Sequence, residues 1–216
     1  MKKILGELDD YRLEKRQNSI VAPLRPCDLP LLCAITKAQS IVDYGGSSGW
    51  VWDYLKECNL EYNIERYIVI EIKNIVDYFN NSNIHSNPVR YMTVEEYNGN
   101  CNIFYTNSVL QYIGDDTIFF NLISRINPDF ILIEDFLGGD IDEYYSLQIY
   151  YEDRIPQKFR NIGTFISQMK NIDYMLILEK PYITAQRGKI RTLSMSNFPK
   201  EKILLYTKTL IFKKFK

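Results

Sequence analysis

The sequence predicts an α/β protein with a doubly wound sheet of seven strands, mostly parallel with an antiparallel last strand, flanked by helices at the N-terminus. Short runs of β-branched and aromatic residues alternate with helix-like segments, which is typical of parallel strands joined by crossover helices. A glycine-rich turn, DYGGSSG at 43–49, follows the first such run. With 216 residues the chain is long enough for one well-buried domain and too short for two ordinary ones.

Each predicted strand is a short apolar run bounded by polar residues. The seven runs are 39–44, 66–72, 89–92, 102–107, 129–135, 173–180 and 203–214. Amphipathic segments between them predict helices at roughly 48–58, 73–80, 115–126 and 162–171, with a short turn at 93–97. Asp115 or Asp116 is the expected N-cap of the third of these helices. The last run follows a loop without room for a crossover helix, so it is expected to enter antiparallel beside 173–180.

The N-terminal part of the chain is expected to form a helical cap rather than a strand of the sheet. Residues 1–38 hold two helical stretches, about 2–16 and 28–38, divided by two prolines. The sequence therefore divides into a cap at 1–38 and a sheet domain at 39–216.

The composition argues against several classes of partner. The 26 basic and 27 acidic residues nearly cancel, so no global field attracts nucleic acid or an anionic membrane. The longest apolar stretches have strand length and no signal-peptide core leads the chain, which predicts a cytoplasmic protein without an integral membrane segment. The four cysteines have no CxxC spacing and His85 is the single histidine, so no metal site is predicted. His85 precedes the third strand and belongs at the amino edge of the sheet, away from a site at the carboxyl edge.

The turn after the first strand is the expected ligand-binding loop, because ligands of such sheets lie beyond the carboxyl ends of the strands. Gly45 and Gly46 permit backbone conformations closed to other residues and allow close approach of a ligand. Ser47 or Ser48 is expected to cap the helix that follows. The dinucleotide pattern GxGxxG fails, since it would need glycine where Ser47 and Trp50 stand.

The loop instead resembles the [DE]xGxGxG motif of class I S-adenosylmethionine-dependent methyltransferases. Asp43, Gly45 and Gly49 match the motif, and Ser47 occupies the position of its middle glycine. The resemblance implies a Rossmann-like fold and S-adenosylmethionine as the cofactor, with S-adenosylhomocysteine as its product. It places these four residues and Gly46 beside the cofactor.

The resemblance also implies where the rest of the cofactor would lie. Glu71 ends the second strand, 22 residues after Gly49, where this fold places an acidic side chain to bind the two ribose hydroxyls. The alternative for Glu71 is a solvated strand end. Further cofactor contacts are expected from Ile72 and from residues at the ends of the next strands. One or more of Thr93, Val94, Glu95 and Glu96 would contact the adenine, and Tyr105, Thr106, Asn107 and Ser108 leave the fourth strand beside the methionine portion, with Thr93, Val94, Asn107 and Ser108 as the chosen residues.

The segment TNSVLQYI (106–113) is similar to the one that follows the fourth strand of class I methyltransferases. Two further segments, LQIYYEDRIPQKFRNIGTFI (147–166) and MSNFPK (195–200), resemble a bacterial methyltransferase family often encoded in gene clusters for O-antigen, capsule or other surface glycans. Together the similarity covers nearly everything from residue 39 onward. The resemblance implies O-methylation of a sugar or a sugar-linked intermediate. A small-molecule or glycan acceptor is the expected partner.

The catalytic candidates stand at strand ends on the same edge. Glu134 and Asp135 end the fifth predicted strand, and Tyr182 follows the sixth. Solvation of the strand ends or hydrogen bonding within loops is the competing interpretation. The long connection at about 138–163 is expected to cover the site as a lid or an acceptor wall.

The residues expected to face the acceptor are aromatic, amide and basic side chains, which suit a sugar. They are Gln148, Tyr150, Tyr151 and Arg154 in the predicted lid, with Gln186 and Arg187 as a second set. Two other functions stay open from the sequence. One is a nucleotide-sugar or dinucleotide-dependent enzyme, and the other is a methyltransferase-like protein that has lost catalysis and serves as a partner.

Overall fold

The computed structural model describes residues 28–82, 87–150, 153–184, 189–190, 192–193 and 195–215. Its main sheet has seven strands in the order β3-β2-β1-β4-β5-β12-β9. The strands of this sheet are β1 (Ser40–Tyr44), β2 (Arg66–Ile70), β3 (Val89–Met92), β4 (Ile103–Asn107), β5 (Phe130–Phe136), β9 (Tyr174–Pro181) and β12 (Lys208–Lys214). The α-helices within the described residues are α2 (Leu29–Thr36), α3 (Trp50–Glu57), α4 (Lys73–Ser82), α5 (Asp116–Ile126) and α6 (Ile162–Asn171).

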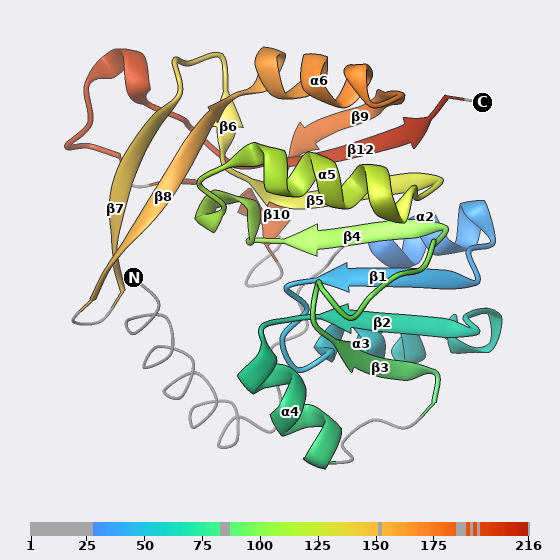
Figure 1. The fold of residues 1–216 in the computed structure, drawn as a ribbon. Helices are drawn as coiled ribbons and strands as arrows, with labels where there is room; N and C mark the ends of the chain where they lie inside the picture. The colour runs from blue at the N-terminus through green and yellow to red at the C-terminus, as the bar shows by residue number, and fades with distance from the viewer. Residues whose placement is uncertain are drawn as a thin grey trace.

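The predicted doubly wound sheet is confirmed, including its antiparallel last strand. β12 pairs antiparallel with both β5 and β9, and the remaining pairs are parallel. In Figure 1 the arrows of β1, β2 and β4 point left and the arrow of β12 points right. The carboxyl ends of the parallel strands therefore meet at one edge, called the carboxyl edge below.

The last strand begins five residues later than predicted, at Lys208 instead of 203. The intervening residues, 203–207, follow a short 3-10 helix, η3 (Lys200–Lys202), and one of them, Tyr206, forms an isolated bridge with Thr192. The apolar side chains of residues 203–207 are typical of a strand, which explains the prediction. The backbone of this segment pairs with the preceding loop and not with the main sheet.

Two apolar cores, one on each face, hold the sheet between helices. Alternate residues of a strand face opposite sides, so Ile41 of β1 lies in the core under α2, α3 and α4, whereas Val42 lies in the core under α5 and α6. α2 contributes Leu29, Leu32 and Cys33 to the first core, so this part of the predicted cap packs on the sheet. The other predicted cap helix, about 2–16, lies outside the described residues.

The connection after β5 folds as strands, which the sequence analysis did not predict. β6 (Gly138–Gly139), β7 (Tyr144–Tyr150) and β8 (Asp153–Asn161) form a second sheet in the order β6-β8-β7. β7 and β8 pair antiparallel from Tyr144 opposite Phe159 to Tyr150 opposite Asp153, which makes a hairpin, and Figure 1 shows the hairpin beside the carboxyl edge.

A buried ion cluster attaches this hairpin to the start of α5. Arg160 is 1% exposed and donates from Nη2 to Asp116 Oδ1 at 2.6 Å and to the Ile113 carbonyl at 2.8 Å. Lys158 donates to the other carboxylate oxygen of Asp116 at 2.7 Å. Ion pairs that lie this deep are strongly destabilising to break, so the hairpin is fixed at its base.

A third small core joins the base of the hairpin to the segment before β12. Its buried members are Leu137, Ile141, Phe159, Met195 and Leu204. The rings of Tyr144 and Phe159 stack with centroids 4.5 Å apart. Segments far apart in sequence thus form one wall beyond the carboxyl edge.

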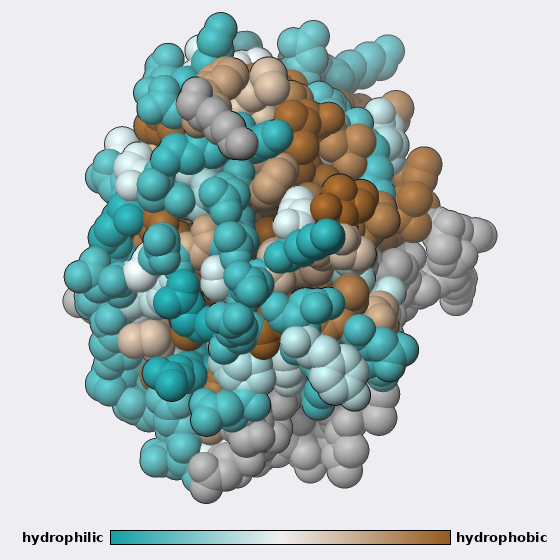
Figure 2. Space-filling model, turned by 90° about the vertical axis from the view of Figure 1, so that its right-hand side faces the viewer, coloured by the Kyte–Doolittle hydropathy of each residue, from teal (hydrophilic) through white to brown (hydrophobic). Residues whose placement is uncertain are grey.

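The opposite side of the molecule is the amino edge, where the parallel strands begin. Figure 2 looks onto this side and shows a largely hydrophilic surface with an apolar area in its upper right part. Elements that reach this edge carry exposed apolar side chains, namely Ile35 of α2, Met175 of β9 and Phe215 after β12. None of the helices within the described residues is long and apolar enough to span a membrane.

Candidate cofactor and active site

The loop after β1 requires glycine at its first two glycine positions. Gly45 has φ +72°, and a Cβ there would lie 2.3 Å from Cγ2 of Val109. A Cβ on Gly46 would lie 2.4 Å from Cγ of Asp43. Real Cβ atoms essentially never come this close to another atom, so a side chain at either position would force Val109 or Asp43 to move.

The expectation that Ser47 or Ser48 caps α3 is wrong. The N-cap is Gly49, with φ 71°, and no side chain caps the helix there. Ser47 takes a left-handed conformation with φ 57°, which a motif glycine would adopt without strain. Its backbone N–H donates to Glu71 Oε1 at 2.9 Å, so its role in the structure is to connect the loop to the end of β2.

Asp43 supports the loop from below. It is 1% exposed and accepts a hydrogen bond of 2.6 Å from the hydroxyl of Tyr67. Burial raises the pKa of Asp43 to about 7, the Tyr67 hydrogen bond acts against this, and the nearby charge of Glu71 adds to it. Tyr91 of β3 also fixes the loop, because its hydroxyl donates to the Ser48 carbonyl at 2.8 Å.

A cleft of about 580 Å³ opens between the loop and the ends of β2 and β3. The residues predicted to bind the cofactor that line it are Gly45, Glu71, Ile72, Thr93 and Val94, and the two other adenine candidates, Glu95 and Glu96, line it as well. The sequence analysis missed Tyr44, Ile70, Lys73 and Val109, which also line the cleft. Val109 directly follows the predicted Asn107 and Ser108, and its contact with the loop could have been found only from the pairing of β1 with β4.

The walls of the cleft differ in chemistry. Ile72, Val94 and Val109 provide apolar surface suited to a flat ring, and Ile72 is 45% exposed. The turn after β3 is held by reciprocal bonds, from the Thr93 N–H to Glu96 Oε2 at 2.8 Å and from the Glu96 N–H to Thr93 Oγ1 at 3.3 Å. An apolar slot beside the Glu71 carboxylate fits an adenosine, whose base is flat and whose ribose carries two hydroxyl donors.

Other predicted residues do not line the cleft. Asp43 lies near the end of β1, and Gly46, Ser47 and Gly49 lie in the loop after it, whereas a second group lies together in a polar cluster at the ends of β4 and β5. We call it the edge cluster, and its members are Tyr105, Asn107, Ser108, Glu134, Asp135 and Tyr182. Glu134 is at its centre and is 2% exposed. Its Oε2 accepts from the Tyr105 hydroxyl at 2.9 Å and lies 3.1 Å from Asn107 Nδ2.

The other carboxylate oxygen of Glu134 binds the start of α2. The Asp28 N–H donates to Oε1 at 2.7 Å, and Lys180 donates to the Asp28 carboxylate at 2.7 Å. Burial raises the pKa of Glu134 to about 7, with the donors from Asp28 and Tyr105 acting against it. Since donors surround both oxygens, this carboxylate is arranged to orient its neighbours.

The remaining members of the edge cluster link β4, β5 and β9. The Ser108 hydroxyl contacts Asp135 and donates to Asn107 Oδ1 at 2.8 Å. Asn107 Nδ2 lies 3.2 Å from the Tyr182 hydroxyl. Ser108 and Asp135 both have positive φ, 59° and 57°, at facing strand ends. Left-handed backbone at non-glycine residues is uncommon and clusters at functional sites.

The hairpin places the predicted acceptor residues only in part. Gln148 Oε1 accepts from the Tyr112 hydroxyl and from Gln157 Nε2, both at 2.9 Å, and Arg154 is exposed. Tyr151, the side chain of Tyr150, and Gln186 and Arg187 lie outside the described residues, as does His85. No group of three or more His, Cys, Asp or Glu within the described part of the chain could hold a metal ion.

Comparison with solved structures identifies the fold. No family model and no curated protein matches the chain. The 1,6-didemethyltoxoflavin-N1-methyltransferase of Burkholderia thailandensis, solved with S-adenosylhomocysteine, has 14% identity and a TM-score of 0.61, covering 98% of this chain and 86% of its own. An S-adenosylmethionine-dependent methyltransferase of Mesorhizobium loti has 10% identity and a TM-score of 0.57, covering 87% and 97%. A glycopeptide N-methyltransferase solved with S-adenosylmethionine has 8% identity and a TM-score of 0.58, covering 88% and 93%.

The comparison assigns the chain to a class of fold. This chain has the fold of class I S-adenosylmethionine-dependent methyltransferases, with the sheet order and the antiparallel strand described above. At sequence identities of 8% to 14%, the structural similarity shows a shared fold and nothing beyond it. The activity is argued from the site itself.

Proposed function

We propose that this protein is an S-adenosylmethionine-dependent methyltransferase that methylates an oxygen of a sugar or sugar-linked intermediate of bacterial surface-glycan synthesis. The observation that carries the proposal is the connection between the glycine loop and Glu71 across a cleft of about 580 Å³. This arrangement lies at the carboxyl edge of a sheet with the strand order of methyltransferases.

The residues around the cleft divide the binding of S-adenosylmethionine between them. Glu71 would accept hydrogen bonds from the ribose hydroxyls, and Ile72, Val94 and Val109 would enclose the adenine. Asn107 and Ser108 would approach the methionine portion from the end of β4. Asp43 is buried and away from the lining, so we assign it the support of the loop and not a contact.

The bound cofactor supplies an electrophilic methyl group, and the protein has to align an acceptor atom with it. Positioning contributes about 7–11 kcal/mol to such a reaction, whereas a general base contributes a factor of about 10²–10⁴. The edge cluster suits a positioning role because Glu134 is held by the Asp28 N–H and by Tyr105. We propose that Glu134 orients Asn107 and Tyr182, and that Asp135 takes part beside Ser108.

A sugar acceptor is supported by the surface chemistry of the hairpin and its neighbour η2 (Leu110–Tyr112). Tyr112 is 40% exposed and Tyr145 is 60% exposed, so each presents an aromatic face. Gln148 and Arg154 add an amide and a charge to the same hairpin. Aromatic faces with amide and charged groups suit a polar ring compound.

Calorimetric titration tests the proposal. We expect micromolar binding, about −8 kcal/mol, of S-adenosylmethionine and S-adenosylhomocysteine, and no binding of NAD or UDP-glucose. Failure of both methionine-derived ligands to bind would refute the proposal, and binding of NAD or UDP-glucose alone would favour the other enzyme class. Mass spectrometry of surface glycans from cells with and without the gene then tests the acceptor, and identical methylation in both strains would exclude a glycan.

A further inference from the structure

The hairpin strand β7 has one side free for a further strand. The second sheet has the order β6-β8-β7, so β7 pairs with β8 on one side only. Within the described residues no backbone hydrogen bond joins β7 to any other segment. Figure 1 shows β7 as the outer strand of the hairpin, with β8 between it and the main sheet. The free side of β7 therefore offers backbone N–H and C=O groups to another strand.

The middle residue of β7 directs its backbone to the free side. Leu147 lies directly opposite Pro156 of β8, and proline has no N–H to donate. In an antiparallel pair, opposed residues either exchange two hydrogen bonds or make none with each other. A proline fits the second kind of pair, which indicates that Leu147 points its N–H and C=O away from β8. Tyr145 and Ile149, two positions away on either side, share this orientation because the pattern alternates.

The sequence of β7 lacks the features that keep edge strands apart. Natural proteins protect such strands with charged residues, with proline or by keeping them short. β3, at one end of the main sheet, has four residues and an exposed Arg90, and β9, at the other end, carries Glu179 and Lys180. β7 reads YYSLQIY, which is seven residues without a charge or a proline. Of these three strands, β7 is the one suited to pair with a further strand.

One face of β7 is apolar and exposed. Tyr145 is 60% exposed, Leu147 is 55% exposed and Ile149 is 77% exposed. Alternate residues of a strand share a face, so these three side chains form one stripe. Association that covers part of this stripe removes apolar surface from water and is favoured for that reason.

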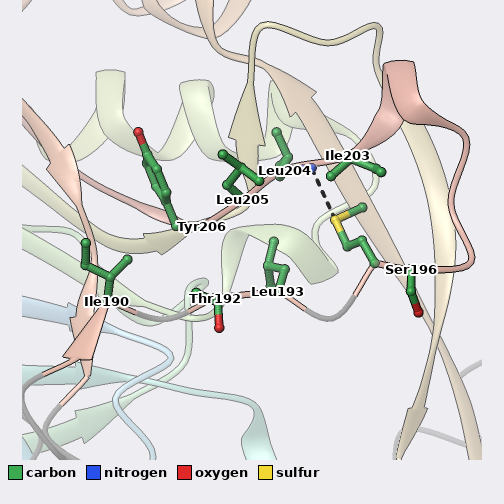
Figure 3. Close-up of a pocket in the computed structure, with 9 residues that line it drawn as sticks. Ile190, Thr192, Leu193, Ser196, Ile203, Leu204, Leu205 and Tyr206 are labelled. Carbon is green, nitrogen blue, oxygen red and sulfur yellow. Dashed lines mark hydrogen bonds between the residues drawn. The ribbon is translucent and has the colours of Figure 1, made fainter.

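A groove of about 520 Å³ near the start of β12 shows the contrast with β7. Its walls include Leu193 and Leu205, whose backbones are already paired, since the Leu193 N–H donates to the Leu205 carbonyl at 3.3 Å. Thr192 and Tyr206 form the bridge beside them, and Figure 3 shows all four residues around the groove. These backbone groups are satisfied within the chain, unlike those on the free side of β7.

The residue pattern of β7 is complementary to itself. When two copies of the strand pair antiparallel about a two-fold axis at Leu147, this residue lies opposite its own copy. Tyr145 then lies opposite the partner's Ile149, and Ser146 lies opposite the partner's Gln148. Apolar residues thus meet apolar residues on one face, and polar residues meet polar residues on the other. A strand of another protein would have to supply this pattern, whereas a second copy of the chain already has it.

We propose that two copies of the chain form a dimer by antiparallel pairing of β7 with β7 about a two-fold axis at Leu147. The outward N–H and C=O of Leu147 pair with the same groups of the partner, and the two hairpins form one continuous sheet. Arg160 and Asp116 already fix the base of the hairpin, so little ordering accompanies association. One strand pair buries less than the about 1,600 Å² of a standard interface, so the dimer dissociates in the micromolar range. The dimer needs neither cofactor nor acceptor and is independent of the proposed methyl transfer.

Sedimentation velocity over protein concentrations of about 1–200 µM measures the association. We expect the wild type to pass from monomer to dimer across this range. The variant Leu147→Lys places two like charges opposite each other at the axis and should raise the dissociation constant about tenfold or more. The matched control is Ile177→Lys on the edge strand β9, where the isoleucine is 46% exposed, and it should associate like the wild type.

A mixing experiment tests the register of the pairing. Leu147→Lys and Leu147→Glu should each stay monomeric where the wild type is a dimer. An equimolar mixture of the two should dimerise, because opposite charges then face each other at the axis. Leu147 is exposed, so both variants should unfold thermally like the wild type, which separates lost association from a lost fold.

Three results would overturn the proposal. A wild type that stays monomeric at every concentration would leave the free side of β7 to a strand of another protein. A dimer that persists in Leu147→Lys and is lost in Ile177→Lys would assign the contact to β9. A mixture of the two charge variants that stays monomeric would exclude the pairing of Leu147 with its own copy.

Discussion

The two halves of the carboxyl edge are built in different ways. Around β1, β2 and β3 the cleft is formed by short turns that directly follow strands, and each turn is fixed by contacts such as those of Ser47 and Thr93. Around β5, β9 and β12 the edge is covered by the described parts of two long insertions, 137–161 and 182–207, which pack on each other through residues such as Phe159 and Leu204. We call the two halves the cofactor half and the acceptor half after the roles proposed for them. Short turns can keep one ligand geometry, whereas long insertions can vary.

The two halves also differ in where they place charged side chains. In the cofactor half Glu71 lies in the open cleft, where its carboxylate can meet a ligand. In the acceptor half the buried charges of Arg160 and Asp116 attach the hairpin of β7 and β8 to the start of α5 and do not line the cleft. Substitutions in the two halves should therefore separate binding from stability.

The largest effect is expected from Asp116→Ala. The substitution leaves the buried cations Arg160 and Lys158 facing each other without their carboxylate, which costs about 3–5 kcal/mol of unfolding free energy. Urea denaturation measures this loss, and S-adenosylhomocysteine affinity should change by less than about twofold at an unlinked site. The control is Asp115→Ala, which removes only the N-cap of α5 and should cost about 1 kcal/mol. Equal stability of the two variants would contradict the anchoring role of Asp116.

The next effect concerns pH and the Glu134 carboxyl. Burial raises its pKa from 4.5 to about 7, so the folded protein binds the proton more tightly than the unfolded chain. This contribution to stability is fully present below pH 4.5 and is lost as the pH rises to about 7. At about 1.36 kcal/mol per unit, the decline amounts to about 3 kcal/mol.

Glu134→Gln should remove this part of the decline. Asp43, whose pKa is also raised to about 7, continues to contribute a decline in the same direction. Unfolding free energies in urea at several pH values between 4.5 and 8 measure the slope, and Glu57→Gln, at an exposed position of α3, is the control. Parallel curves for wild type and Glu134→Gln would show that Glu134 titrates normally.

Glu71→Ala is expected to weaken S-adenosylhomocysteine binding by about 1.5–3 kcal/mol for each charge-assisted hydrogen bond lost. The reason is the loss of the carboxylate that lines the cleft beside Ile72. Titration calorimetry measures the affinity, and Glu57→Ala provides an exposed glutamate outside the cleft for comparison. A folded Glu71→Ala protein with wild-type affinity would exclude the ribose role.

The smallest effect is expected from Ser47→Gly. Glycine relieves the left-handed conformation of this residue but gains freedom in the unfolded chain, so the net stabilisation should be about 0.5–1 kcal/mol. Thermal unfolding compares it with Ser48→Gly, because Ser48 is not among the residues with positive φ and should gain nothing. S-adenosylhomocysteine affinity should stay within about twofold, and a larger fall would show that the Ser47 hydroxyl contacts the cofactor.

The sequence by itself determined the sheet, its helices and the position of the cofactor loop. Those features depend on local signals, namely the alternation of apolar runs, the Asp115 cap and the glycines after Asp43. Such signals act over a few residues, so they can be read from the chain without knowing its partners. The pairing of the loop with Glu71 could also be anticipated, because parallel strands end at one edge.

Only the tertiary structure decided how the acceptor half is closed. The hairpin of β7 and β8 has exposed apolar residues such as Leu147 and Ile149, so its sequence lacks a clear inward face. Asp28 meets Glu134 across 106 residues, and no local pattern encodes that contact. The left-handed Ser47, where a cap was expected, follows from the bond between its N–H and Glu71 and from the glycine conformations on either side. Long-range contacts of this kind form when insertions pack on the finished sheet, and packing is a property of the folded chain as a whole.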